Sequence, residues 1–177
     1  EKMVALILPL AEKKGLELKL ELADDIKTAK TAQRRLEQVI LNLLNNAVKF
    51  TEKGHVRISC QSQNDQYVLS VSDTGAGIQP EELPGLFRPF HQIDTGLTRK
   101  HEGTGLGLSV SYGLVRRYGG DITVSSEPGR GTVFEVRLRN TSGVEQSGTL
   151  ACSFPGIPPI AVLHEGQHTY GRETISE

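Results

Sequence analysis

The stretch that decides the fold runs from residue 35 to residue 50 and reads RLEQVILNLLNNAVKF. At 100° per residue its apolar side chains gather on one face, which predicts a helix that packs against a sheet. Thr31 stands where it can cap the helix start, and Gly54 lies just past the end. We therefore expect a long amphipathic helix over about residues 32–51. Its expected buried face comprises Leu36, Val39, Ile40, Leu43, Ala47 and Phe50.

A second stripe on the same helix is polar and consists of Gln38, Asn42, Asn46 and Lys49. Asparagine is a mediocre helix former, so two of them one turn apart beside a core face need an explanation. One interpretation is a solvated helix face with harmless amides. The other is the wall of a binding site, because amide oxygens can ligate Mg²⁺ and a lysine can meet a phosphate. The stripe by itself leaves both interpretations open.

A carboxylate and two glycines follow a predicted pair of strands, 56–62 and 67–72. Residues 73–77 read DTGAG, which is typical of an ordinary turn at the end of a strand. The same residues also suit the base of a pocket. There Asp73 would accept a hydrogen bond from an exocyclic amine, and glycines would let the backbone approach a flat ring. The motif alone does not decide between the two.

Alternate glycines open the next predicted helix, 106–118, because residues 103–108 read GTGLGL. Free amides and the helix dipole at such a start form a natural anion site. The chain contains no Gly-Lys-Ser/Thr, so this is not a P-loop. The spacing and the preceding loop also fit a dinucleotide-binding fold poorly. A glycine-rich helix entry of purely structural purpose is the remaining alternative.

The rest of the pattern is that of an α/β domain over residues 1–140. Met3 and Ile7 follow helical spacing, Pro9 belongs at a kink or near a helix start, and Gly15 is placed to end that helix. Strict alternation over residues 16–22 predicts a strand with one buried face, and two more strands are expected at 121–125 and 132–139. Residues 141–177 are rich in Gly, Pro and Ser, which favours a tail or linker.

Composition excludes several classes of protein. The 177 residues include 37% hydrophobic ones, so wholesale disorder is excluded. With 20 Lys and Arg against 21 Asp and Glu, no basic excess supports binding to nucleic acid by bulk charge. Two cysteines are too few for a disulfide framework and fit a reducing compartment. The longest apolar run, residues 3–10, is too short to span a bilayer. These observations predict a soluble, cytoplasmic domain.

Taken in order, the motifs resemble the catalytic, ATP-binding domain of sensor histidine kinases. The resemblance covers residues 1–139 and includes the Asn/Lys helix, the DTGAG turn, the FRPF segment at 87–90, the GTGLGL helix entry and the GRGT turn at 129–132. This family belongs to the superfamily of gyrase-type, mismatch-repair and chaperone ATPases. It implies a two-layer α/β sandwich of the Bergerat type, with helices on one face of a mixed sheet and ATP held under a mobile lid.

The resemblance also implies residue roles. Asn46 would be the Mg²⁺ ligand, Asp73 would read the adenine amino group, and Arg99 and Lys100 would steady the γ-phosphate. Residues implied to act in catalysis are Asn42, Asn46, Lys49 and Arg99. Those implied to bind the cofactors ATP and Mg²⁺ are Asn46, Lys49, Asp73, Gly75, Gly77, Ile78, Phe90, Arg99, Lys100, Gly103, Thr104, Gly105, Leu106, Gly107, Leu108 and Thr132.

The expected lid spans residues 79–102. Leu86, Phe87 and Phe90 are expected to anchor its first part, and residues 94–102 are expected to become ordered around the γ-phosphate. Two departures from the family pattern stand out. Thr31 occupies a position that is often acidic in relatives, and Glu102 lies where a carboxylate would repel a triphosphate unless it points outward.

Asn42 favours a kinase over an ATPase. Hydrolytic relatives carry a glutamate at this position to activate water, whereas a neutral amide cannot take up a proton. The γ-phosphate would then go to a histidine on a separate dimerisation domain, expected before Glu1, for relay to the receiver domain of a response regulator. Homodimerisation would occur only through that upstream domain.

Three other interpretations have less support in the sequence. Residues 164–168 read HEGQH, a metalloprotease-like pattern, but Gly166 and the upstream prolines oppose the helix that it needs. Cys152 with His164 and His168 lacks a fourth zinc ligand. A non-catalytic module that senses nucleotides through the lid is favoured only by Glu102.

Overall fold

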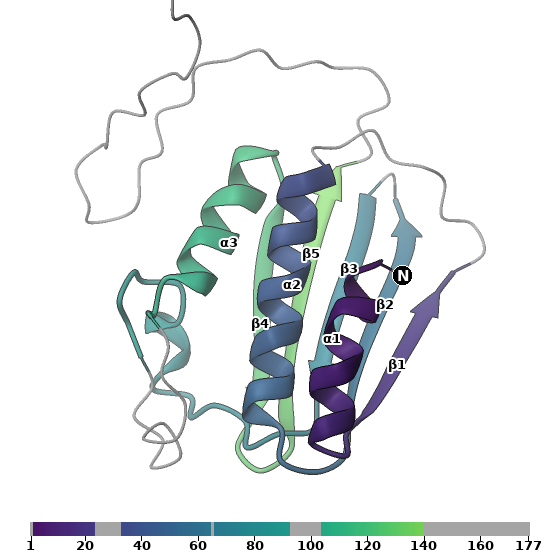
Figure 1. Ribbon diagram of the computed structural model, residues 1–177. Helices are drawn as coiled ribbons and strands as arrows, with labels where there is room; N and C mark the ends of the chain where they lie inside the picture. The colour runs from purple at the N-terminus through teal and green to yellow at the C-terminus, as the bar shows by residue number, and fades with distance from the viewer. Residues whose placement is uncertain (1, 24–32, 65, 93–103, 140–177) are drawn as a thin grey trace, which may run out of the picture. The chain divides into compact units, whose positions relative to one another are not determined.

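Three α-helices cover one face of a five-stranded sheet in the part of the chain that the structure describes (Figure 1). This computed structural model describes residues 2–23, 33–64, 66–92 and 104–139. The elements in chain order are α1 (Lys2–Lys13), β1 (Glu17–Leu22), α2 (Gln33–Phe50), β2 (His55–Gln63), β3 (Gln66–Asp73), the 3₁₀ turn η1 (Leu83–Gly85), α3 (Gly107–Arg117), β4 (Asp121–Glu127) and β5 (Gly131–Arg139).

The sheet is mixed, as predicted. Its strand order is β1-β2-β3-β5-β4, with β1 parallel to β2 and all other neighbours antiparallel. Helices α1, α2 and α3 lie side by side on the same face, with α2 in the middle (Figure 1). The arrangement confirms the predicted two-layer α/β sandwich.

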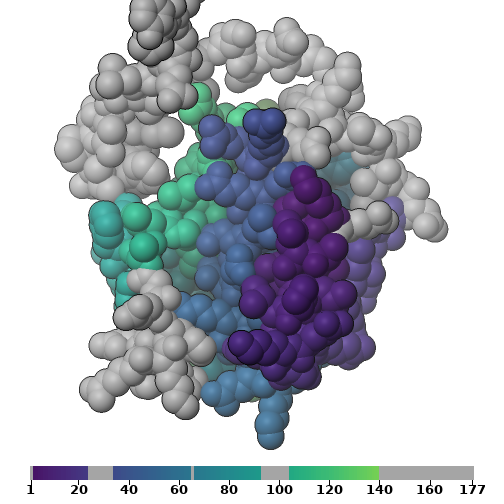
Figure 2. All heavy atoms as spheres, in the orientation of Figure 1, coloured from purple at the N-terminus to yellow at the C-terminus, as the bar shows by residue number. Residues whose placement is uncertain are grey.

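Helix α2 is more deeply buried than its apolar stripe predicted. Val39, Leu43 and Ala47 are buried against the sheet as expected, and Leu44 and Val48 are buried as well. Helix α1 packs along one flank of α2, as the purple and blue atoms of Figure 2 show. The expected core position of Phe50 was wrong, since its side chain is 39% exposed at the last residue of the helix.

Strand β1 differs from its predicted burial. Leu16, just before the strand, is 6% exposed, whereas Leu20 and Leu22 are 37% and 49% exposed. The reason is that β1 is an edge strand, and the cover given by the helix layer fades along it. Pro9 lies inside α1 rather than at its start. It is on an exposed side of that helix, where water can satisfy the carbonyl that lost its amide partner.

The C-terminus of α2 is held by a lysine from outside the helix. Lys14, just after α1, donates from Nζ to the carbonyl oxygens of Val48 and Lys49 at 2.8 Å and of Thr51 at 3.2 Å. A cation at this end also meets the negative pole of the helix dipole. The clamp therefore fixes the last turn of α2, which carries Lys49.

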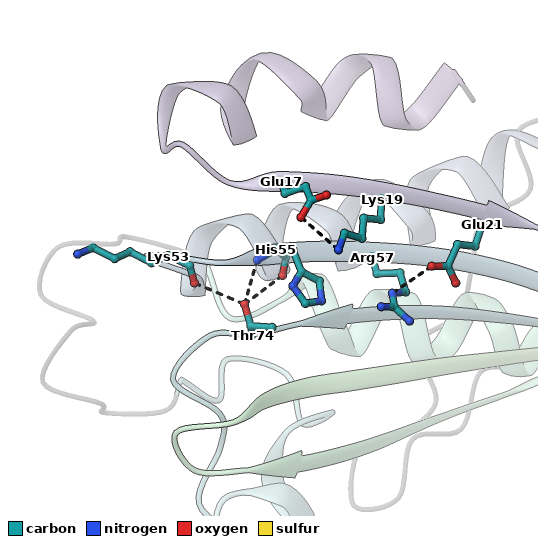
Figure 3. Close-up of polar contacts among 7 residues, drawn as sticks. All are labelled: Glu17, Lys19, Glu21, Lys53, His55, Arg57 and Thr74. Carbon is teal, nitrogen blue, oxygen red and sulfur yellow. Dashed lines mark hydrogen bonds and ion pairs between the residues drawn. The ribbon is translucent and has the colours of Figure 1, made fainter.

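The other face of the sheet is polar. Along β2, Val56 and Ile58 point into the core, so Arg57 between them faces away from the helices. Arg57 pairs with Glu21 at 3.4 Å, and Lys19 pairs with Glu17 at 3.1 Å (Figure 3).

Candidate functional site

A cavity of about 320 Å³ lies where α2, the end of β3, the segment after β3 and the start of α3 meet. Its walls come from segments far apart in sequence, so only the tertiary fold assembles it. Its lining residues are Asn42, Asn46, Ala47, Lys49, Phe50, Glu52, Asp73, Ala76, Gly77, Ile78, Leu86, His91, Gln92, Thr104, Gly105, Gly107, Leu108, Thr132 and Phe134.

The polar stripe of α2 forms one wall. Asn42, Asn46 and Lys49 line the cavity, whereas Gln38 is exposed and does not. Three of the four residues of the stripe therefore form a cavity wall, and the fourth, Gln38, faces solvent. The Lys49 ammonium also lies 5.0 Å from the centre of the Phe50 ring.

Asn42 joins α2 to α3. Its Nδ2 donates to the hydroxyl of Ser111 at 2.9 Å, and Ser111 is 2% exposed. Gly107 packs so closely that a Cβ there would overlap the amide of Asn42. The side chain is therefore held between two residues one turn apart on α3. Sequence reasoning missed Ser111, because no pattern within α3 shows which α2 residue it meets.

Asp73 lies at the floor of the cavity, at the end of β3. Its Oδ1 accepts a hydrogen bond from the amide of Gly75 at 2.8 Å. Burial raises the pKa of the Asp73 carboxyl above its ordinary 3.8, and backbone hydrogen bonds from Gly75 and Thr132 oppose that rise. A buried carboxylate with acceptor capacity left over is suited to a ligand that donates hydrogen bonds.

The two glycines after Asp73 serve close backbone packing. A Cβ at Gly75 would overlap the carbonyl of Phe50, and one at Gly77 would overlap the carbonyl of Glu127. Gly77 also has φ +69° and lines the cavity, whereas Gly75 does not. Ile78, next along the chain, contributes an apolar side chain to the lining.

The start of α3 closes the opposite side. Thr104, Gly105, Gly107 and Leu108 line the cavity, and Leu106 is the N-cap residue of the helix. No side chain caps this terminus, so its first amides keep their donor capacity. Arg99, Lys100 and Gly103, like His101 and Glu102, lie outside the described residues, and their expected roles stay predictions.

Of the three residues expected to anchor the lid, two are packed against the rest of the domain and one is exposed. Leu86 is buried and lines the cavity, and Phe87 stacks on Tyr112 of α3 with ring centres 5.1 Å apart. Phe90 instead is 75% exposed and is not among the lining residues. Its φ of +62° directs the side chain away from the core, while its amide donates to the carbonyl of Gly105. Packing therefore anchors this segment through Leu86 and Phe87 only.

Several lining residues escaped sequence reasoning. His91 and Gln92 line the cavity, and the His91 ring lies against Gly85 with its Nε2 3.6 Å from Glu82 Oε2. Phe134 closes the floor from β5. The positions of His91 and Gln92 depend on the irregular path of the segment after β3. Hydrophobic periodicity predicts only regular helices and strands, so it could not predict this path.

Two negative findings apply to the described residues. They hold no group of three or more His, Cys, Asp or Glu side chains that could bind a metal, and none of their helices is long and apolar enough to cross a membrane. Cys152, His164 and His168 lie outside the described residues.

Comparison with known proteins identifies the class to which this fold and site belong. Residues 31–142 match the family model described as histidine kinase-, DNA gyrase B-, and HSP90-like ATPase. This chain belongs to that family. The resemblance seen in the motifs is confirmed.

Individual relatives narrow the class to sensor kinases. The chain is 43% identical over 132 residues to the sensor histidine kinase RcsC of Escherichia coli, which covers 74% of this chain and 14% of that protein. It is 43% identical over 137 residues to the autoinducer 2 sensor kinase/phosphatase LuxQ of Vibrio cholerae, covering 73% of this chain and 16% of that one. A crystal structure of full-length ShkA in complex with AMPPNP superposes with a TM-score of 0.71 at 33% identity, over 77% of this chain and 28% of ShkA. The chain thus spans only a small part of each of these relatives.

Proposed function

We propose that this chain is the ATP-binding catalytic domain of a two-component sensor histidine kinase. It donates the γ-phosphate of Mg-ATP to a histidine on a separate dimerisation domain, for relay to a response regulator. The observation that supports this most directly is that one cavity brings together Asn46 and Lys49 of α2, Asp73 of β3 and the uncapped start of α3. Relatives named as sensor histidine kinases support the same assignment.

The lining fits an adenine nucleotide at both ends. The Asp73 carboxylate accepts a hydrogen bond from the exocyclic amine, and the apolar side chains of Ile78 and Phe134 flank the base. The free amides at the start of α3 and the Lys49 ammonium meet the phosphates. The cofactor is thus recognised through charge and hydrogen bonds at opposite sides of one cavity.

The amide oxygen of Asn46 is the candidate ligand for Mg²⁺. Oxygen donors are what this ion prefers, and Mg²⁺ binding with few protein ligands is usual where phosphates supply the rest. The ion would supply charge neutralisation at the phosphates. Asn42 and Lys49 lie along the same stripe of α2, one on each side of Asn46.

Asn42 supports transfer to a histidine rather than hydrolysis. Its amide is held by Ser111 and has no basic atom that could take a proton from water. A γ-phosphate bound here is therefore retained for a better nucleophile. That nucleophile is an imidazole on the dimerisation domain, and the reaction takes place in the cytoplasm, where ATP is supplied.

The test is phosphotransfer with a matched pair of variants. The chain is combined with a histidine-bearing dimerisation domain of a related kinase, and transfer of radiolabelled γ-phosphate to the histidine is measured. We expect Asn46→Asp to reduce transfer by about 100-fold, because the new carboxylate faces the phosphates and draws Lys49 into an ion pair. Asn45→Asp is the control, since Asn45 is exposed on the same helix and does not line the cavity.

Two outcomes would contradict the proposal. Equal transfer by Asn46→Asp and Asn45→Asp would remove Asn46 from the site. ATP binding by the wild-type chain with no transfer to any histidine domain would favour a nucleotide-sensing module instead.

A further inference from the structure

A partly buried polar network lies beneath the floor of the cavity, centred on Ser126 of β4. The Ser126 hydroxyl accepts a hydrogen bond from the amide of Ile78 at 2.9 Å and donates its proton to the carbonyl of Gly131 at 2.9 Å. It also lies 2.9 Å from the hydroxyl of Thr132. Ser126 and Thr132 are cross-strand partners on β4 and β5, and Thr132 is 5% exposed. The network thus joins three segments around one serine.

The direction of the third hydrogen bond follows from counting protons. A serine hydroxyl has one proton to donate and two lone pairs that accept. The amide of Ile78 can only donate, so it takes one lone pair, and the carbonyl of Gly131 can only accept, so it takes the proton. The remaining contact is therefore a hydrogen bond that Thr132 donates to Ser126. The proton of Thr132 is committed to this bond.

This commitment leaves only lone pairs on the Thr132 hydroxyl for other partners. Thr132 lines the same cavity as Asp73, and its backbone amide donates to the Asp73 carboxyl. The floor accordingly presents two acceptors side by side, a carboxylate and a hydroxyl whose proton points elsewhere. Two acceptors match an exocyclic amine, which has two N–H donors, and repel a carbonyl in the same position.

We propose that Ser126 is a positioning residue that sets base specificity, because it fixes the direction of the Thr132 hydroxyl and thereby makes the floor accept purines with an amine rather than a carbonyl at C6. The inference rests on the proposed function, since it concerns how the same cavity reads its nucleotide. Ser126 acts through Thr132 and is not itself among the residues that line the cavity. Without it, Thr132 can turn its proton toward the cavity and donate to a carbonyl.

The test compares Mg-ATP with Mg-ITP, in which the exocyclic amine of adenine is replaced by a carbonyl and N1 carries a proton. Calorimetric titration gives the ratio of the two affinities for each variant. We expect Ser126→Ala to lower the preference for ATP by about tenfold, which is the size of one hydrogen bond. Ser125→Ala is the matched control, because Ser125 is exposed on the opposite face of β4 and its removal should leave the ratio unchanged.

A double-mutant cycle separates this role from a merely structural one. If Ser126 acts through Thr132, then Thr132→Val and the double variant Ser126→Ala/Thr132→Val should show the same ratio, because the valine has no proton to redirect. A change in ratio that persists on the valine background would assign the effect to the freed amide of Ile78 and overturn the inference. Equal losses of ATP and ITP affinity in Ser126→Ala would overturn it too.

A second pair of variants keeps the inference testable if Ser126→Ala does not fold. Thr132→Ser retains a hydroxyl that donates to Ser126, so the ATP preference should persist, whereas Thr132→Val should lower ATP affinity and leave ITP affinity unchanged. Equal ratios in these two variants would contradict the inference. A wild-type chain that binds neither nucleotide would contradict the proposed function itself, whereas ATP binding with an unaltered ratio in the variants would contradict only the role of Ser126.

Discussion

At the scale of single residues, Asp73 shows a conflict between stability and binding. Its carboxyl lies at the cavity floor beside apolar side chains, and burial raises its pKa. A raised pKa means that the folded chain takes up the proton more readily than the unfolded chain. The contribution of Asp73 to the free energy of unfolding therefore falls as pH rises from 3.8 through the folded pKa, and it stays low above that value.

Asp73→Asn should separate the two properties. The variant cannot ionise at this position. The difference in free energy of unfolding between the variant and the wild type should therefore shift in favour of the variant as pH rises through this window, and it should stay constant at higher pH. ATP affinity should fall by about 100-fold, since the amide can turn its donor toward the adenine amine. Chemical denaturation at several pH values, with titration of ATP, measures both quantities. Parallel pH profiles for the two proteins would contradict the assigned burial cost.

At the scale of elements, α2 depends on contacts made at its two flanks. Helix α1 packs along one side, and Lys14 donates hydrogen bonds to carbonyls of the last turn. On the other side Asn42 meets Gly107 and Ser111 of α3. Sequence periodicity identified α2 and its polar stripe, but these flanking contacts depend on neighbours that periodicity within one helix does not specify.

Lys14→Ala should loosen the end of α2. Three hydrogen bonds from one ammonium are lost, two of them to helix carbonyls and one to the carbonyl of Thr51, so we expect a cost of about 2 kcal/mol in the free energy of unfolding. Lys13→Ala is the control, since Lys13 is exposed and makes no such contacts among the described residues, and should change stability by less than about 0.5 kcal/mol. Hydrogen exchange at residues 47–51 should rise only in Lys14→Ala. Equal exchange rates in both variants would show that the hydrogen bonds of Lys14 do not stabilise the end of α2.

At the scale of the whole molecule, the nucleotide should stabilise the fold, because the cavity is formed by both layers. A ligand that binds only the folded state adds about 2.7 kcal/mol at a concentration 100 times its Kd. We expect Mg-ATP to raise the unfolding temperature of the chain accordingly and Mg-GTP to leave it nearly unchanged, since guanine presents a carbonyl to Asp73. Thermal unfolding with each nucleotide is the measurement. Similar shifts with both would argue against adenine recognition by this floor.

The amino-acid sequence by itself determined the order of elements and several of the polar residues that line the cavity. Alternation and helical spacing report which face of an element is buried, and Asn42, Asn46, Lys49 and Asp73 stand at fixed steps on those elements. These local patterns predicted burial wrongly at the end of a helix and along the edge strand, where Phe50, Leu20 and Leu22 are exposed.

Only the tertiary structure decided which residues meet across elements. The bond from Asn42 to Ser111, the Ser126 network beneath Asp73 and the exposed position of Phe90 each depend on chain segments that are distant in sequence or irregular in path. A hydrogen bond needs two groups within about 3 Å, and a periodic pattern gives the direction of a side chain but not the partner that it reaches. The direction of the Thr132 hydroxyl is therefore a property of the assembled sheet, which no single strand carries in its sequence.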